Sequence, residues 1–321
     1  MTAKSDNEAR PSGVPDAYID KLIDRLNSLK DGASAVVDLV ACGMKAIEPL
    51  RRFLLFGEPS GIFQPRQRAV EALGELGAKD VLIEYLASEK DIPDPVVRYG
   101  EEAVESTAAR LLARWRDDDT YRILLWLLRR KALPGLIDAV GEFRRTDATP
   151  ELISALGDSI GRSFAEEALR KIGEGAKRTL IAASLTAHPS ADYETSTSHH
   201  RRRSALRLLT ELKLSEEDWH NLSPLADDRD REIAARACRI ALAVAEESDK
   251  MLAVHRLIKL LPDTSWSLQI EIEEWLVERS EITRTVIDEE IVRRREAAGG
   301  RSTDELLHRL LALKQKIERK S

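Results

Sequence analysis

Cysteine is scarce in this sequence, because the 321 residues include only Cys42 and Cys238, which lie far apart in the chain. Both fall within apolar helical patterns, so we expect two small core residues rather than a disulfide or a metal pair, in a reducing, cytoplasmic setting. No stretch approaches the roughly 20 uncharged apolar residues that span a bilayer, so no membrane is expected among the partners. The first 15 residues are polar and lack the hydrophobic region of a secretory signal.

Aromatic residues are also few, at 5% of the chain, and no run alternates polar and apolar residues in the way that a strand does. Leu, Ala, Arg and Glu are abundant instead, which favours an all-α protein. The 50 Lys and Arg against 56 Asp and Glu give a net charge of −6. This acidic balance provides no general attraction to nucleic acid or to anionic lipid.

Signatures of catalysis and of metal binding are missing as well. No helix carries two of the six histidines at zinc-ligand spacing, no C-x-x-C occurs, and no serine or cysteine is visibly paired with a base. The acidic runs at Asp117–Asp119 and at Asp227, Asp228 and Asp230 precede expected helices, where carboxylates complement the helix dipole. We therefore predict no enzyme activity, no catalytic residue, no cofactor and no metal.

What the sequence does contain is a repeated helical stripe. Ala69, Ala72, Leu73 and Leu76 stand at i, i+3, i+4 and i+7, which is one face of an α-helix. The same stripe returns about every 34 residues, a period typical of repeat proteins. The stripes begin at Ala69, Ala108, Leu136, Ala165, Ala205, Ala234 and, in a weaker copy, Ile272.

Second apolar helices separated by Pro and Gly lie between the stripes, so each repeat is expected to be an antiparallel helix hairpin. One hairpin cannot bury its apolar face alone, and stacking on a neighbour buries it. The predicted fold is all-α: an α-solenoid of stacked hairpins with roughly 13 to 16 helices and no sheet. The predicted organisation is a disordered tail at 1–14, the solenoid at 15–298, and a C-terminal capping helix with a basic tail at 301–321.

The segment RQRAVEALGELGAKDVLIEYL at 66–86 resembles a HEAT-like repeat, in the short form of the phycobilin-lyase-type family. That form has an Arg ahead of an alanine-rich helix that ends in Leu-Gly, and LIDAVGEF at 136–143 is similar. Other copies depart from it, with Arg170 and Thr210 in the place of the glycine. The resemblance implies an α-solenoid that usually has a binding role, without naming a partner.

The first candidate binding surface is the loop FGEPSGIFQP at 56–65. It contains three large apolar side chains, which either dock onto a partner or fold back over the edge of the solenoid. The candidate partner-binding residues in and next to this loop are Phe56, Ile62, Phe63, Gln64 and Arg66.

The second candidate is the end of the long connection at 186–200 and the arginines that follow it. Its cationic side chains either meet phosphate or an acidic protein surface, or belong to a solvated loop that leads into an exposed helix. The residues are His199, His200, Arg201, Arg202 and Arg203. The five tryptophans lie mostly on apolar stripes and are assigned to packing.

The leading hypothesis is a non-enzymatic HEAT-repeat scaffold that binds another protein through its concave face or through protruding loops. Two alternatives stay open. One is a nucleic-acid-binding protein similar to HEAT-like alkylpurine DNA glycosylases, against which the net charge argues. The other is a lyase-like subunit that handles a chromophore or another cofactor. The partner's identity and the oligomeric state are not determined by the sequence.

Overall fold

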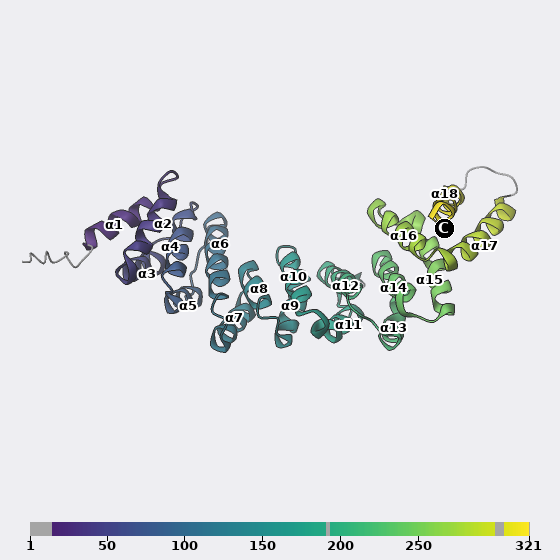
Figure 1. Ribbon diagram of the computed structural model, residues 1–321, viewed down its shortest axis with the longest axis horizontal. Coiled ribbons are helices and arrows are strands. Elements are labelled where there is room, and N and C mark those ends of the chain that lie inside the picture. The colour runs from purple at the N-terminus through teal and green to yellow at the C-terminus, as the bar shows by residue number, and fades with distance from the viewer. Residues whose placement is uncertain (1–14, 191–192, 299–304, 321) are drawn as a thin grey trace, which may run out of the picture. The chain divides into compact units, whose positions relative to one another are not determined.

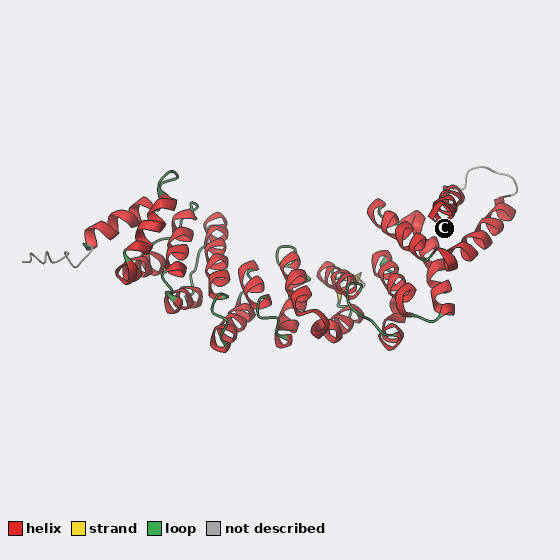
Figure 2. Ribbon diagram, viewed as in Figure 1, coloured by secondary structure: helices red, strands yellow, loops and turns green. Residues whose placement is uncertain are grey.

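The computed structural model describes residues 15–190, 193–298 and 305–320. The chain divides into two compact units, Met1–Phe143 and Arg144–Ser321. Helices make up most of the described chain in both units (Figure 2), so the all-α class is confirmed. The predicted tail at 1–14, and the first residues of the predicted C-terminal segment at 301–321, lie outside the described residues.

The first unit is a series of antiparallel helices joined by short turns (Figure 1). Its elements are α1 (Asp16–Arg25), α2 (Gly32–Ala41), the 3-10 helix η1 (Gly43–Ala46), α3 (Ile47–Phe56), α4 (Gln64–Glu75), α5 (Lys79–Ala87), α6 (Pro95–Leu112), α7 (Asp118–Arg130) and α8 (Pro134–Gly141).

The second unit continues the pattern with helix pairs separated by 3-10 turns. Its helices are η2 (Thr146–Ala148), α9 (Thr149–Ala155), α10 (Arg162–Ile172), η3 (Gly173–Ala176), α11 (Lys177–Leu185), α12 (Ser196–Leu209), α13 (Glu216–Leu222), η4 (Ser223–Asp227), α14 (Arg231–Val244), α15 (Glu247–Leu260), η5 (Leu261–Asp263), α16 (Trp266–Glu278), α17 (Ser280–Ala298) and α18 (Glu305–Lys320).

Two details differ from the sequence-based expectation. The α-helices of the described residues run to α18, above the predicted 13 to 16, because short helices such as α9 and α13 have no stripe of their own. A small hairpin of β1 (Pro189–Ser190) and β2 (Tyr193–Glu194) also pairs within the connection before α12. Two residues per strand do not change the fold class.

The helices of each unit form two layers. In the first unit α2, α4, α6 and α8 pack one against the next, and α3, α5 and α7 form the second row. In the second unit α10, α12, α14 and α16 are neighbours in one row, and α9, α11 and α13 in the other. Each hairpin therefore buries its apolar face against the hairpins before and after it, which is the arrangement that the repeat predicts.

The repeated stripe forms the core between these layers. Its first three positions are buried in all six full copies, as in Ala69, Ala72 and Leu73 of α4. The fourth position is only half-buried in five copies, since those helices end at or before it. Helix α14 continues to Val244, and its fourth position, Ala241, is buried.

Small residues allow the stripe helices to approach closely. A Cβ on Gly135 would lie 2.1 Å from the backbone oxygen of Ser106, so the start of α8 rests directly on α6. The turn between α4 and α5 has a different requirement, because Gly77 has a φ of +72°, a left-handed conformation that glycine adopts without strain.

The acidic runs serve as helix caps. The Asp117 carboxylate accepts a hydrogen bond from the backbone N–H of Thr120 at the start of α7 (2.8 Å). Asp230 accepts from the N–H groups of Glu232 and Ile233 at the start of α14 (3.0 and 3.1 Å). The interpretation of these acids as helix-terminal residues is confirmed.

The assignment of all tryptophans to packing is wrong in part. Trp219 and Trp275 are buried, whereas Trp126 and above all Trp266, with 76% of its surface exposed, face solvent. Among the described residues, no helix is both long enough and apolar enough to cross a membrane.

Candidate functional site

The loop between α3 and α4 is held against the start of α6 by two of its residues. Phe63 is half-buried, and its Cβ lies 3.2 Å from the position that a Cβ on Gly100 would occupy. A Cβ on Gly61 would lie 3.7 Å from Cγ1 of Val96, one turn earlier on the same face of α6. Ile62 stands between these two anchors and is left exposed. One of the three apolar residues therefore folds back, and the other two face outward.

Four exposed apolar side chains lie on this loop, at the end of α3 and at the start of α6, against which the loop packs. We call them the loop patch, and their exposed fractions are 73% for Phe56, 66% for Ile62, 67% for Val96 and 59% for Tyr99. Arginines flank the patch, with Arg51 over the Phe56 ring (5.9 Å from guanidinium carbon to centroid) and Arg98 over the Tyr99 ring (5.8 Å). Aromatic and arginine side chains together are the commonest anchors of protein interfaces.

The sequence analysis missed Val96 and Tyr99. Its stripe in α6 begins at Ala108, and the same face extended back toward Pro95 passes through Val104 and Gly100, both buried. Val96 and Tyr99 are three residues apart and highly exposed for their size. Two large apolar residues at the start of α6, ahead of the stripe, were the signal that could have identified them.

Arg66 does not fit the predicted role of a partner contact, because it is buried. Its guanidinium donates to the backbone oxygens of Leu54 (2.6 Å) and Gly57 (3.0 Å), which close α3. It also makes a bidentate pair with Glu101 of α6, in which both N···O distances are 2.8 Å. Gln64, at the start of α4, remains exposed. Arg66 is thus the internal support of the loop rather than part of its surface.

The support is a buried polar cluster around Glu101. The Tyr85 hydroxyl donates to the Glu101 carboxylate (2.7 Å), and the Lys90 ammonium pairs with it as well. Burial by itself opposes ionisation of Glu101, but the hydrogen bonds from Arg66 and Lys90 outweigh it and lower the pKa of the carboxyl. Burial raises the pKa of Tyr85 and lowers that of Lys90. The cluster fixes α3, α4 and α6 relative to one another.

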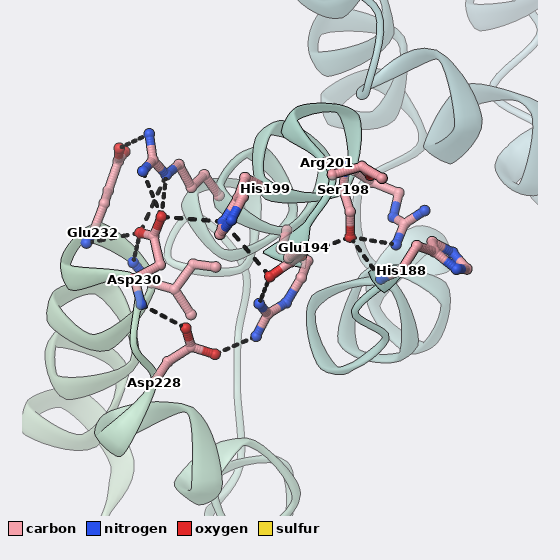
Figure 3. Close-up of polar contacts among 12 residues, drawn as sticks. His188, Glu194, Ser198, His199, Arg201, Asp228, Asp230 and Glu232 are labelled. Carbon is pink, nitrogen blue, oxygen red and sulfur yellow. Dashed lines mark hydrogen bonds and ion pairs between the residues drawn. The ribbon is translucent and has the colours of Figure 1, made fainter. Parts of the chain in front are cut away.

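The second predicted region gathers around the start of α12 (Figure 3). The hairpin of β1 and β2 brings Glu194 against this helix, where its carboxylate accepts from Ser198 Oγ (2.6 Å) and from Arg202 (2.7 Å). Thr195 caps the helix by accepting from the backbone N–H of Ser198 (3.2 Å). Through Glu194 and Thr195 the described end of the connection is therefore tied to α12, although His188 and Tyr193 remain exposed to solvent.

Arg202 is buried, which contradicts its prediction as a partner contact. It donates to the backbone oxygen of Ser184 near the end of α11 (2.8 Å) and pairs with Glu194 and Asp228. Arg203 pairs with Asp230, the cap of α14. Both arginines act between helices, so their charges are already matched inside the unit.

The other three residues of this region are half-buried. Nδ1 of His199 lies 3.2 Å from a carboxylate oxygen of Asp230, as Figure 3 shows. Arg201 donates to the backbone oxygen of Thr186 (2.7 Å). Burial, together with the positive charges of Arg162 and Arg203, lowers the pKa of His200. The structure brings the five residues together as a packing junction of α11, α12 and α14 rather than as an open cationic surface.

Within the part of the chain that the structure describes, no group of three or more His, Cys, Asp or Glu side chains is arranged to hold a metal ion. Cys42 and Cys238 are both free, and burial raises the pKa of the Cys238 thiol to about 12.

The resemblance to HEAT-like repeats is confirmed at the level of the fold. Each unit is a stack of antiparallel helix pairs in two layers. No protein-family model matches the sequence, and no curated protein matches it.

Similar solved structures include the crystal structure of Kap121p, with 14% sequence identity and a TM-score of 0.39 over 94% of this chain. The chain spans 40% of the length of Kap121p. Another is the complex of CpcE and CpcF of phycocyanin lyase from Nostoc sp. PCC7120, with 14% identity and a TM-score of 0.26. That match covers 98% of this chain and 100% of the other. Likenesses this distant do not identify what the chain binds.

Proposed function

We propose that this chain is a non-enzymatic HEAT-repeat scaffold that binds another protein, and that the loop patch is its contact surface. The observation that carries the proposal is the exposure of Phe56, Ile62, Val96 and Tyr99 on a loop and on the helix start against which that loop packs. Exposed apolar side chains that gather on one surface are typical of interaction sites. A cytoplasmic, reducing setting, inferred from the two free thiols, is part of the same proposal.

Rigidity of the loop supports this role. A loop that is ordered before binding loses less conformational entropy when a partner docks on it. Here Phe63 anchors the loop to α6, and buried Arg66 ties the end of α3 to Glu101. The patch is thus presented by a supported loop in a fixed position.

A protein partner is favoured over nucleic acid because of the arginines of the second unit. One interpretation of the sequence was that Arg202 and Arg203 bind phosphate. In the structure these arginines are paired with Glu194, Asp228 and Asp230. Phosphate binding at this place would require breaking those pairs. Exposed aromatic and aliphatic side chains in the loop patch instead match the composition of protein interfaces.

Site-specific photo-crosslinking tests the proposal. A photoreactive residue at Ile62 is expected to give a discrete set of protein adducts in the native cell extract. The same residue at Met44, which is also exposed but lies in η1 outside the patch, should not give them. The double substitution Ile62→Ser and Tyr99→Ser should reduce capture of the same partner by about tenfold or more, as expected for interface anchors. Identical adducts at both positions, or capture that is insensitive to the double substitution, would refute the loop patch as the contact surface.

A further inference from the structure

Helix α16 exposes an unusual face for a helix inside a repeat stack. Ile272 and Leu276 are buried against the unit, while Trp266 and Ile270, four residues apart, are exposed on another face. Val277 continues this face two turns later and is half-buried. An exposed apolar stripe of this kind is the form of surface on which another helix packs.

The surface beside this stripe is hollowed. A hollow of about 360 Å³ lies between α16 and α18 and is lined by Ile270, Val277, Lys316 and three glutamates of α16. A second hollow, of about 350 Å³, adjoins it where α16 meets α17, and Glu278 lines both. Because Glu278 lines both hollows, we treat them as one surface, which we call the α16 groove.

The α16 groove carries an excess of negative charge. Its walls contain five carboxylates, against three cations, which gives a formal charge of −2. Glu273 is paired with Lys316 (2.5 Å) and Glu278 with Arg239 (2.7 Å). Among the described residues, Glu274 and Glu281 make no ion pair. The groove can therefore accept cations from a ligand without first losing an internal pair.

The chain itself shows which kind of segment fits beside α16. Helix α18 is amphipathic: Leu310, Leu313 and Ile317 are buried, and Lys314 pairs with Asp288 of α17. Lys316 pairs with Glu273, and Arg309 donates to the side-chain oxygen of Gln269 (2.5 Å). A basic amphipathic helix is thus already docked along one wall of the groove.

We propose that the α16 groove binds a second basic amphipathic helix, supplied by a partner protein. Its apolar residues would cover Trp266, Ile270 and Val277, and its lysines or arginines would pair with Glu274 and Glu281. This surface belongs to the second unit and does not depend on the loop patch. Trp266, which is exposed one turn before Ile270, is the expected anchor, since large aromatic side chains contribute most to such contacts.

A synthetic helix tests this directly. The probe is a fluorescein-labelled peptide of about 18 residues, or five turns, with leucines at i, i+3, i+4 and i+7 on one face and lysines on the flanks. Fluorescence anisotropy with the full chain is expected to show saturable binding. The double substitution Glu274→Lys and Glu281→Lys should weaken it about tenfold, and Ile270→Ser should weaken it too. The matched control is Glu217→Lys with Glu289→Lys, the same charge change at exposed positions outside the groove, and it should leave the affinity unchanged.

Two further probes separate specific docking from charge attraction. A peptide with serine in place of each leucine keeps its charge, and one with glutamate in place of each lysine keeps its apolar face. If neither the serine-substituted peptide nor the glutamate-substituted peptide binds the chain, the proposal is supported. Equal binding of the serine peptide, equal weakening by the control substitutions, or no saturable binding of the original probe would each overturn it.

Discussion

At the scale of single residues, two buried carboxylates one turn apart on α6 have opposite electrostatic environments. Glu101 pairs with Arg66 and Lys90, and these interactions lower its pKa despite burial. Glu105 is equally buried, and burial raises its pKa even though Lys131 donates to it (2.7 Å). The charge of Glu101 is therefore stabilised by folding, and the charge of Glu105 is opposed by it.

Substitution of Glu101 by Gln should lower the free energy of unfolding by about 3–5 kcal/mol, because it leaves a buried guanidinium without its counter-charge. Glu102→Gln, on the partly exposed neighbouring position, is the control and should have little effect. The pH dependence has a definite sign. The pKa of Glu101 in the folded protein lies below the unfolded value of about 4.3. The ionised carboxylate therefore makes its full contribution to the free energy of unfolding above about pH 4.3, and this contribution is lost as the pH falls through the folded pKa. Urea denaturation of both variants across this range measures it, and equal losses for both variants would contradict the assigned role.

Glu105→Gln should behave differently. The pKa of Glu105 is raised in the folded protein. Above that pKa the ionised Glu105 therefore lowers the free energy of unfolding of the wild-type protein, and this loss disappears as the pH falls through the pKa. Removal of the charge eliminates this loss, and Lys131, which is partly exposed, can turn to solvent. We expect a neutral or slightly increased free energy of unfolding near pH 7, measured by urea denaturation. A loss as large as that of Glu101→Gln would show that the pair with Lys131 outweighs burial.

At the scale of elements, one arginine position joins successive hairpins. Arg66, Arg162 and Arg202 each lie three residues before the first alanine of their stripe. Each donates to a backbone oxygen at the end of the preceding helix: Leu54 (2.6 Å), Leu156 (3.1 Å) and Ser184 (2.8 Å). The last carbonyls of a helix have no partner within it, so the arginine supplies one. Arg231 has the same position before Ala234 but donates to the backbone oxygen of Asp263, so this link is made in three of the copies.

Arg202→Lys should therefore destabilise the second unit although it keeps the charge. Lysine cannot reach the Ser184 oxygen and both carboxylates at once, because it lacks the planar fork of the guanidinium. We expect a loss of about 2–4 kcal/mol in the free energy of unfolding. The neighbouring Arg201→Lys, which gives up a bond to one backbone oxygen, should cost clearly less. Thermal unfolding of the two variants measures the difference. A smaller loss of stability for Arg202→Lys than for Arg201→Lys would contradict the linking role of Arg202.

At the scale of the whole molecule, stability should be local. In a repeat stack each hairpin contacts only its neighbours, so the effect of a substitution decays along the chain. Glu101→Gln is expected to accelerate amide hydrogen exchange in α3 to α6 and to leave α12 to α16 at their wild-type rates. Hydrogen exchange with mass spectrometry of both proteins measures this. Faster exchange throughout the chain would show instead that the two units unfold as one.

Because contacts are local, the two proposed binding surfaces are independent of each other. The loop patch lies in the first unit and the α16 groove in the second, and each is built from contacts within its own unit. Under the two proposals above, the separate surfaces would let the chain hold two segments of one partner or two partners. Substitutions in one surface should therefore leave the other surface intact.

Much of the fold could be predicted because the stripe is a local signal. Alanines and leucines at i, i+3, i+4 and i+7 both form a helix and mark its buried face, so stacking of hairpins follows from sequence alone. Helix caps such as Asp117 are equally local. For Ile62 the sequence left both docking and folding back open, and the structure leaves this side chain exposed.

The tertiary structure alone decided which charged residues are internal. An arginine looks the same in sequence whether it faces solvent or closes a helix, and Arg66 and Arg202 are buried only because distant carboxylates at Glu101 and Asp228 lie opposite them. Likewise, Val96, Tyr99 and Trp266 are exposed because no element among the described residues covers their faces of α6 and α16. Periodicity reports which face of a helix is apolar, whereas exposure depends on what packs against that face, and such contacts arise from residues far apart in the chain.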